Sequence, residues 1–154
     1  MVTSGTARRG LMAALVSISA AACATAGAGP GARAAAEPVK VVYHLNEGLE
    51  QAGNGLRNIR NHLSADPKAR IVVVAHFKGI DFLLEGAKDR NGSDFAAAVD
   101  DLSLRGVEFR VCNFTLLGRK IDRSSLHPDA KVVPSGVAEV GRLQAQEGYA
   151  YLKP

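Results

Sequence analysis

Tryptophan is absent from this 154-residue sequence, aromatic residues make up 5% of it, and cysteine occurs only twice. Scarce aromatic side chains argue against a surface that stacks nucleic-acid bases. The sequence also has no glycine-rich phosphate loop, no dinucleotide-binding fingerprint and no paired-cysteine zinc motif. These absences exclude several common nucleotide-dependent and zinc-binding classes. The few reactive side chains therefore become the main guide to function.

The first 36 residues have the pattern of an export leader. A basic start precedes an uncharged stretch over residues 10–32, and alanines at 34–36 suit cleavage by a signal peptidase. We therefore predict a signal peptide over residues 1–36. The prediction carries a location with it, which is periplasmic or otherwise exported, in a bacterium.

Three alternatives to a cleaved secretory signal stay open. The uncharged stretch is long enough for a membrane anchor, although its second half is mostly alanine and glycine, which gain little from lipid. Arg8 and Arg9 also fit a loose twin-arginine signal, which exports proteins that fold before crossing the membrane. The third alternative is a lipoprotein signal that ends at Cys23.

Residues 37–154 are sufficient for a single domain with one hydrophobic core. The leader holds three of the 19 basic residues and none of the 15 acidic ones, so this domain is close to neutral. A neutral domain gives no reason to expect nucleic acid or an anionic membrane surface as a partner. We also expect no membrane association once the leader is removed.

Strand-like and helix-like segments alternate along this domain. The predicted strands are short runs rich in β-branched residues, at 39–45, 70–76, 107–112, 130–133 and 149–152. Between them, apolar residues recur at helical spacing over 48–66, 80–87, 93–106, 116–121 and 135–143. Strands joined through helices require right-handed crossovers and a sheet covered on both faces. We predict an α/β fold, a three-layer sandwich around a mainly parallel five-stranded sheet of flavodoxin- or Rossmann-like type.

Reactive side chains end the first three predicted strands, at the edge of the sheet where ligands bind in such folds. They are His44, His76 and Cys112. We expect them to converge if the first strand lies between the second and the third, as in the flavodoxin-like order. Cys112 is the only cysteine after residue 36, so it has no partner for a disulfide within the predicted domain.

Cys112 is the candidate nucleophile, because a thiolate rather than a thiol attacks or accepts sulfur. His44 or His76 would remove its proton or pair with the thiolate. Residues near the same strand ends are predicted to orient or bind the ligand, with turn and helix-cap chemistry as the competing explanation: Asn46, Lys78, Asn113, Ser135 and Gly136. The other two histidines, His62 and His127, are expected to be solvated.

Several segments taken together resemble the DsrE/DsrF-like family of small sulfur-relay proteins, in its exported branch: residues 40–46, 74–76, 106–113, 133–137 and 148–154. The resemblance implies a parallel α/β fold and a homo-oligomer, often a trimer or hexamer. It also implies a cysteine after the third strand, which carries sulfur as a persulfide in the best-understood members. The matching position here is Cys112. Those members are cytoplasmic, so the leader is a departure, and their relay partners are not carried over.

Three functions fit these features. The favoured one is an exported sulfur-relay protein in which Cys112 accepts and passes sulfane sulfur, as a sulfurtransferase or as a carrier without turnover of its own. Its partners would be a sulfur donor or acceptor protein or a small sulfur compound, and no cofactor is expected beyond the persulfide. The second is a copper- or zinc-binding protein that uses His44, His76 and Cys112. The third is a non-catalytic subunit of an oligomer.

Overall fold

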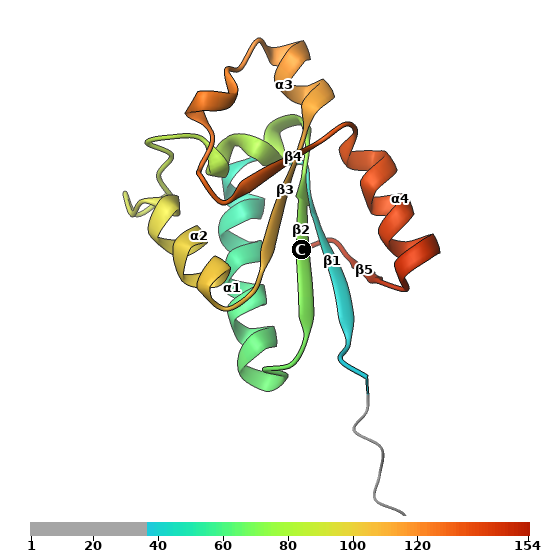
Figure 1. Cartoon of the computed structure of the whole chain (residues 1–154). Coiled ribbons are helices and arrows are strands. Elements are labelled where there is room, and N and C mark those ends of the chain that lie inside the picture. Colours follow the sequence, from blue (N-terminus) through green and yellow to red (C-terminus); the bar gives the residue numbers. More distant parts are fainter. Residues whose placement is uncertain (1–36) are drawn as a thin grey trace, which may run out of the picture. The chain divides into compact units, whose positions relative to one another are not determined.

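The structure is a computed structural model that describes residues 37–154, and the predicted signal peptide lies outside the described residues. Within residues 37–154, no helix combines the length and the hydrophobicity needed to cross a membrane. Five strands form one sheet with helices on both of its faces (Figure 1). The predicted three-layer α/β sandwich is therefore confirmed.

All neighbouring strands in the sheet are parallel, and their order is β4-β3-β2-β1-β5. The strands are β1 (Lys40–Leu45), β2 (Arg70–Ala75), β3 (Glu108–Cys112), β4 (Ala130–Val133) and β5 (Ala150–Leu152). The expectation that the first strand lies between the second and third is wrong, because β2 lies between β1 and β3. The chain steps in one direction from β1 to β4 and reverses only at its last crossover, which hydrophobic patterning does not reveal.

The helical segments lie close to their predicted places. They are α1 (Leu49–Ala65), the 3₁₀ helix η1 (Phe77–Leu83), α2 (Phe95–Leu104), α3 (Asn113–Arg119), the short 3₁₀ turn η2 (Arg123–Ser125) and α4 (Gly136–Glu147). The helix predicted over 80–87 is only partly right, because η1 is a 3₁₀ helix that begins and ends earlier. The helix predicted over 93–106 begins slightly later, because Asp94 is the N-cap of α2.

Handedness explains which helices cover which face. A right-handed crossover that steps one way across the sheet places its connecting segment on one face, and a step the other way uses the opposite face. The connections from β1 through β4 therefore put α1, η1, α2 and α3 together. The return from β4 to β5 places α4 alone on the other side, where it contacts β1, β2, β3 and β5 (Figure 1). We call these sides the α1 face and the α4 face.

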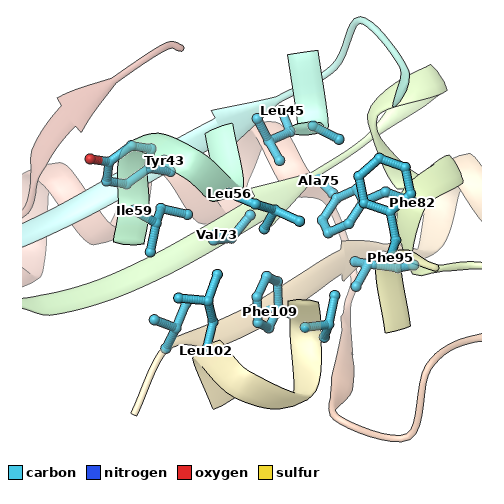
Figure 2. Packing of buried hydrophobic residues seen from close by; sticks show 14 of the residues in the cluster. Tyr43, Leu45, Leu56, Ile59, Val73, Ala75, Phe82, Phe95, Leu102 and Phe109 are labelled. Atoms are coloured by element: carbon cyan, nitrogen blue, oxygen red, sulfur yellow. The ribbon is translucent and has the colours of Figure 1, made fainter. Parts of the chain in front are cut away.

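The two faces bury very different cores. On the α1 face, 20 buried residues form one cluster, which includes Phe82, Phe95 and Phe109 in edge-to-face contact (Figure 2). The α4 face holds a cluster of five buried residues: Val42, Val72, Val74, Val140 and Leu143. Side chains alternate along each strand, so every second residue of β1, β2 and β3 belongs to the thinner α4 face.

Gly79 sets how closely η1 approaches the end of β1. A Cβ at this position would lie 2.1 Å from the carbonyl oxygen of Leu45 and 2.5 Å from the amide nitrogen of Asn46. No side chain fits there, because both neighbours are backbone atoms. Glycine thus lets the segment after β2 pack directly against the loop after β1, which draws the two strand ends together.

Candidate functional site

Three reactive side chains lie at the carboxyl end of the sheet on its α4 face. His44 follows Val42 by two residues on β1, and His76 follows Val74 by two, so both take the parity of the α4 cluster. Cys112 follows Val111, which packs in the core of the α1 face, so its side chain takes the opposite parity. The predicted convergence therefore occurs, although β2 rather than β1 is the middle strand.

His44 and His76 form a directly hydrogen-bonded pair. Their Nε2 atoms are 2.6 Å apart, and the rings stack with centroids 4.8 Å apart. Burial lowers the pKa of both imidazoles, and the pKa of His44 is lowered further by His76 and Lys153, with Glu47 opposing. Both rings are therefore neutral at pH 7. Neutral imidazoles can share one proton without mutual repulsion.

Tyr151 completes this group from the edge strand β5. Its hydroxyl lies 2.8 Å from Nδ1 of His44, and its position on β5 is in register with Val42. The sequence alone predicted no role for Tyr151. The signal that locates it is the parallel pairing of β5 with β1, which follows from the strand order and not from the local sequence.

Gly136, the first residue of α4, separates the histidine pair from the cysteine. A Cβ on Gly136 would lie 3.1 Å from the Cβ of His76 and 3.2 Å from the Cβ of Cys112. Such distances are tighter than ordinary van der Waals contact, so glycine allows α4 to begin between the two side chains. The N-terminus of α4 is thereby brought against the thiol.

Cys112 is buried, with 5% of its surface exposed, and it is a free thiol. Burial raises the pKa of this thiol, but the N–H groups of Gly136, Thr115 and Phe114 and the hydroxyl of Thr115 together outweigh burial and hold the pKa below its usual value. Cys112 is also the N-cap residue of α3, although its side chain makes no formal capping hydrogen bond. The N–H groups thus act as dipoles directed toward the sulfur, and they favour the thiolate.

Thr115 connects the thiol to a strained turn after β2. Phe77 has a φ of 53°, a left-handed conformation that is unusual for a bulky residue. Its N–H donates to Oγ1 of Thr115 at 2.9 Å, and Arg119 donates to its carbonyl oxygen at 2.9 Å. Because the Thr115 oxygen accepts from Phe77, its own proton is free to point toward Cys112. The spacing of three residues from Cys112 to Thr115 was the available sequence clue, since an N-cap residue faces the third residue of its helix.

The five predicted ligand-contacting residues separate into two groups. Gly136 presents its N–H to the thiol, and the buried side-chain oxygen of Asn46 has no hydrogen-bond partner among residues 37–154. Ser135 instead caps α4 by accepting from the Ala138 N–H at 3.3 Å, and Asn113 accepts from Arg123 at 2.6 Å. Lys78 is exposed. Ligand contact by all five stays a prediction.

The geometry does not favour the three-ligand copper or zinc site. Among residues 37–154, one group gathers three such ligand atoms within 4.8 Å, and it consists of Asp100, His127 and Asp129 rather than His44, His76 and Cys112. In that group, Nδ1 of His127 accepts the backbone N–H of Asp129 at 3.2 Å, so Nε2 carries the proton and faces Asp100 at 3.2 Å. A protonated nitrogen has no lone pair for a metal. This group is a hydrogen-bonded turn.

His62 and His127 are partly buried rather than fully solvated as the sequence predicted. Nδ1 of His62 is hydrogen-bonded to the Tyr43 hydroxyl at 3.0 Å. The side chain of His127 lies beside Asp100 and is 9% exposed. The prediction assumed that a histidine in a helix or loop faces water, and the hydrogen bonds of these two side chains show why that assumption was too simple. Neither lies among the residues gathered at the carboxyl end of the sheet.

Comparison with known proteins gives a consistent result. The family model for the DsrE/DsrF-like family matches residues 6–154. MTH1491 from Methanobacterium thermoautotrophicum, a protein of unknown function, is 31% identical, with 75% of this chain and 99% of that chain covered and a TM-score of 0.66. The ychN protein from E. coli is 17% identical over 75% of this chain and 99% of its own, with a TM-score of 0.64, a likeness that shows the fold alone. No curated protein matches the sequence.

Proposed function

Because the chain belongs to the DsrE/DsrF-like family, we propose that it is an exported sulfur-relay protein in which Cys112 carries sulfane sulfur as a persulfide. Family membership favours a function of the sulfur-relay type. The residue, the chemistry and the location are the proposal. The activity is that of a sulfurtransferase or of a carrier that acts once per encounter.

The observation that carries the proposal is the surroundings of the Cys112 sulfur. Two helices, α3 and α4, begin beside it, and N–H groups from both are directed at it. Backbone N–H groups at helix starts stabilise negative charge. They would favour the thiolate that attacks a sulfur donor, and they would equally favour a persulfide anion one atom longer. A structural cysteine in an apolar core would instead have a raised pKa.

The proposed step transfers one sulfur atom without net oxidation. The Cys112 thiolate attacks the outer sulfur of a donor persulfide, R–S–SH. The S–S bond of the donor breaks, a new S–S bond forms at Cys112, and the donor leaves as the thiolate R–S⁻. The outer sulfur keeps its proton during the transfer, so charge and atoms balance. Passing the sulfur to an acceptor thiolate is the same reaction with Cys112 as the leaving group.

Burial of Cys112 supports an exported location for such chemistry. A lone accessible thiol in an oxidising compartment is prone to form disulfides between chains. With 5% of its surface exposed, Cys112 is shielded from the thiols of other folded proteins. The proposed location is periplasmic or otherwise exported, after cleavage of residues 1–36.

A homo-oligomer, a trimer or hexamer, is part of the proposal. The edge strand β5 is exposed at all three of its residues, with Tyr151 and Leu152 each 42% exposed. Exposed apolar residues on an open sheet edge invite association. Partners beyond the oligomer would be a sulfur donor or acceptor protein or a small sulfur compound.

The test is the native intact mass of the protein purified from its exported compartment. We expect a gain of one sulfur atom that reductant removes and that the Cys112→Ser variant never shows. The same spectrum reports whether residues 1–36 have been removed. Size under native conditions gives the oligomer number.

Other outcomes would overturn the proposal. A gain of the mass of a metal ion that resists gentle reduction would favour a metal-binding protein. An unmodified mass, with Cys112 resisting alkylation until the protein is denatured, would make the cysteine structural. Retention of residues 1–36 would contradict the cleaved leader and leave the thiol chemistry standing.

A further inference from the structure

Tyr151, His44 and His76 form a continuous hydrogen-bonded row across three strands. The Tyr151 hydroxyl is 2.8 Å from Nδ1 of His44, and Nε2 of His44 is 2.6 Å from Nε2 of His76. The row begins at the exposed edge strand β5 and ends at the strand end nearest to β3. It therefore joins a surface residue to the histidine that packs against Gly136 beside Cys112.

Hydrogen counting limits this row to two arrangements. Each neutral imidazole carries a single N–H, and the contact between the two Nε2 atoms requires one proton. If Tyr151 donates to His44, then His44 donates from Nε2 and His76 carries its proton on Nδ1. If His44 donates to Tyr151, every bond reverses, and Nδ1 of His76 has a lone pair. The two arrangements give His76 opposite chemistry at the same atom.

The first arrangement is favoured by the chemistry of its end groups. A phenol O–H is far more acidic than the N–H of a neutral imidazole, and an imidazole nitrogen is the better acceptor. Donation from Tyr151 to His44 therefore pairs the stronger donor with the stronger acceptor. The charged neighbours of His44, Lys153 and Glu47, form an ion pair with each other and so impose little net charge on the row. Both histidines have a lowered pKa, which keeps them neutral.

We propose that Tyr151 is a positioning residue that fixes the direction of this row, so that His76 presents an N–H donor at Nδ1 rather than a base. The first side-chain carbons of His76 and Cys112 flank Gly136, within 3.2 Å of the place where its Cβ would be. Because a single glycine lies between the two residues, an N–H donor on His76 suits an anionic sulfur one atom beyond Cys112, such as the outer sulfur of a persulfide anion. This interpretation of the ligand rests on the proposed function, whereas the direction of the row does not.

The test begins with the side-chain nitrogens of the wild-type protein. Long-range ¹H–¹⁵N NMR of the intact protein identifies which nitrogen of each histidine carries the proton. We expect the proton on Nε2 in His44 and on Nδ1 in His76. The reverse pattern in the wild-type protein would overturn the proposal without any variant.

Tyr151→Phe removes the hydroxyl and keeps the ring. We expect His44 and His76 to become mixtures of both tautomers in this variant. Tyr149→Phe is the matched control, because it removes a hydroxyl two residues before Tyr151, from a ring that lies beside Lys40, whereas the tyrosine hydrogen-bonded to His44 is Tyr151. This control should leave both tautomers unchanged. Unchanged tautomers in Tyr151→Phe would overturn the positioning role, since the row would then hold its direction without the phenol.

A kinetic readout separates this role from the proposed function. With inorganic polysulfide as the donor, Tyr151→Phe should load sulfur on Cys112 about fivefold more slowly, the effect of one hydrogen bond. Alkylation of the bare thiol should not change, because the N–H groups of α3 and α4 are untouched. If the tautomers are as expected but no sulfur loads even on the wild-type protein, the row stands and the proposed function fails. If sulfur loads equally fast in both proteins, the donor role of His76 fails.

Discussion

The two faces of the sheet divide stability from chemistry. The α1 face packs four helical segments and 20 buried residues into one cluster, whereas the α4 face relies on one helix and five buried residues. His44, His76 and Cys112 all belong to the α4 face. A thinner layer leaves room for partly buried polar groups, which a dense core excludes. The face that contributes less to folding therefore holds the reactive groups.

Charged groups on the α4 face replace part of the missing apolar contact. Arg110 of β3 pairs with Glu108 at 3.0 Å and with Glu139 of α4, and its side chain is 15% exposed. Glu139 also accepts from Arg142 at 2.7 Å. Partly buried pairs of this kind tie a helix in one orientation. They hold the start of α4, and with it Gly136, against the thiol.

Replacement of Gly79 by alanine should have the largest effect. The new Cβ would overlap the Leu45 carbonyl oxygen at 2.1 Å, and we expect a loss of about 4 kcal/mol or more in the free energy of unfolding. On the α4 face, Gly136→Ala meets side-chain atoms at 3.1 Å and should cost about 1–3 kcal/mol while it disturbs alkylation of Cys112. Urea unfolding and thiol alkylation measure both quantities.

Gly53→Ala is the matched control for these glycines. A Cβ at Gly53 meets nothing within 4 Å, so alanine should stabilise α1 by about 0.5–1 kcal/mol. Equal losses for Gly79→Ala and Gly136→Ala would contradict the contrast between backbone and side-chain contacts.

Leucine truncation compares the two cores with the same chemistry. Leu102 on the α1 face and Leu143 on the α4 face are both fully buried. Leu102→Ala should cost about 3–5 kcal/mol, and Leu143→Ala about 2–3 kcal/mol, because a layer of one helix relaxes more easily around a cavity. Leu143→Ala should nevertheless change the alkylation rate of Cys112 more. If Leu102→Ala altered that rate in the folded protein and Leu143→Ala did not, the division between faces would be wrong.

The sequence predicted the elements of the fold better than their order. Strands such as 70–76 are continuous apolar runs bounded by turns, and α1 shows clear helical spacing, so both were located within a few residues. Strand order depends on where the chain reverses direction across the sheet. That reversal, between β4 and β5, leaves no mark in local hydrophobicity, which explains why the flavodoxin-like order was wrong.

The convergence of His44, His76 and Cys112 was predictable for two reasons. Parallel strands all end at the same edge of the sheet, and alternation along each strand fixes which face a side chain takes. Both conditions hold in the predicted and in the observed strand order. Tyr151 and Thr115 were missed for different reasons. Tyr151 reaches His44 only because β5 pairs with β1. Thr115 matters because Phe77, 38 residues earlier, occupies its oxygen. Contacts between segments far apart in the chain determine both roles.

Acid should weaken the packing of the α4 face. The hydrogen bond from Arg142, followed by that from Arg110, holds the pKa of Glu139 below its usual value of 4.5, with burial opposing. A carboxyl with a lowered folded pKa stabilises the protein above its usual pKa, and that contribution is lost as the pH falls through the folded value. The free energy of unfolding should therefore decline as the pH drops below 4.5.

Glu139→Gln sharpens this prediction. The variant should lose about 1–3 kcal/mol at pH 7, and the difference from wild type should narrow in acid, where the wild-type carboxyl is also neutral. Glu50→Gln, at an exposed position on α1, is the matched control and should change little. A constant difference across the pH range would show that the charge of Glu139 contributes nothing. Chemical denaturation at a series of pH values measures the difference in the free energy of unfolding between variant and wild type.

Thr115→Val should have the smallest effect on stability and a clear effect on the thiol. Valine keeps the shape of threonine but removes the hydroxyl that accepts from Phe77 and faces Cys112. The pKa of Cys112 should rise, so alkylation at pH 7 should slow about fivefold, while stability falls by about 1 kcal/mol. Thr115→Ser should keep the wild-type rate.

Ser103→Ala is the control, because it removes a hydroxyl from α2 on the α1 face and should leave the alkylation rate of Cys112 unchanged. A Ser103→Ala effect as large as that of Thr115→Val would mean that the thiol senses general loosening of the fold, and the separation of stability from chemistry would fail. A rate that follows only the Thr115 hydroxyl would place control of the thiol in the hydrogen bond between Thr115 and the turn at Phe77.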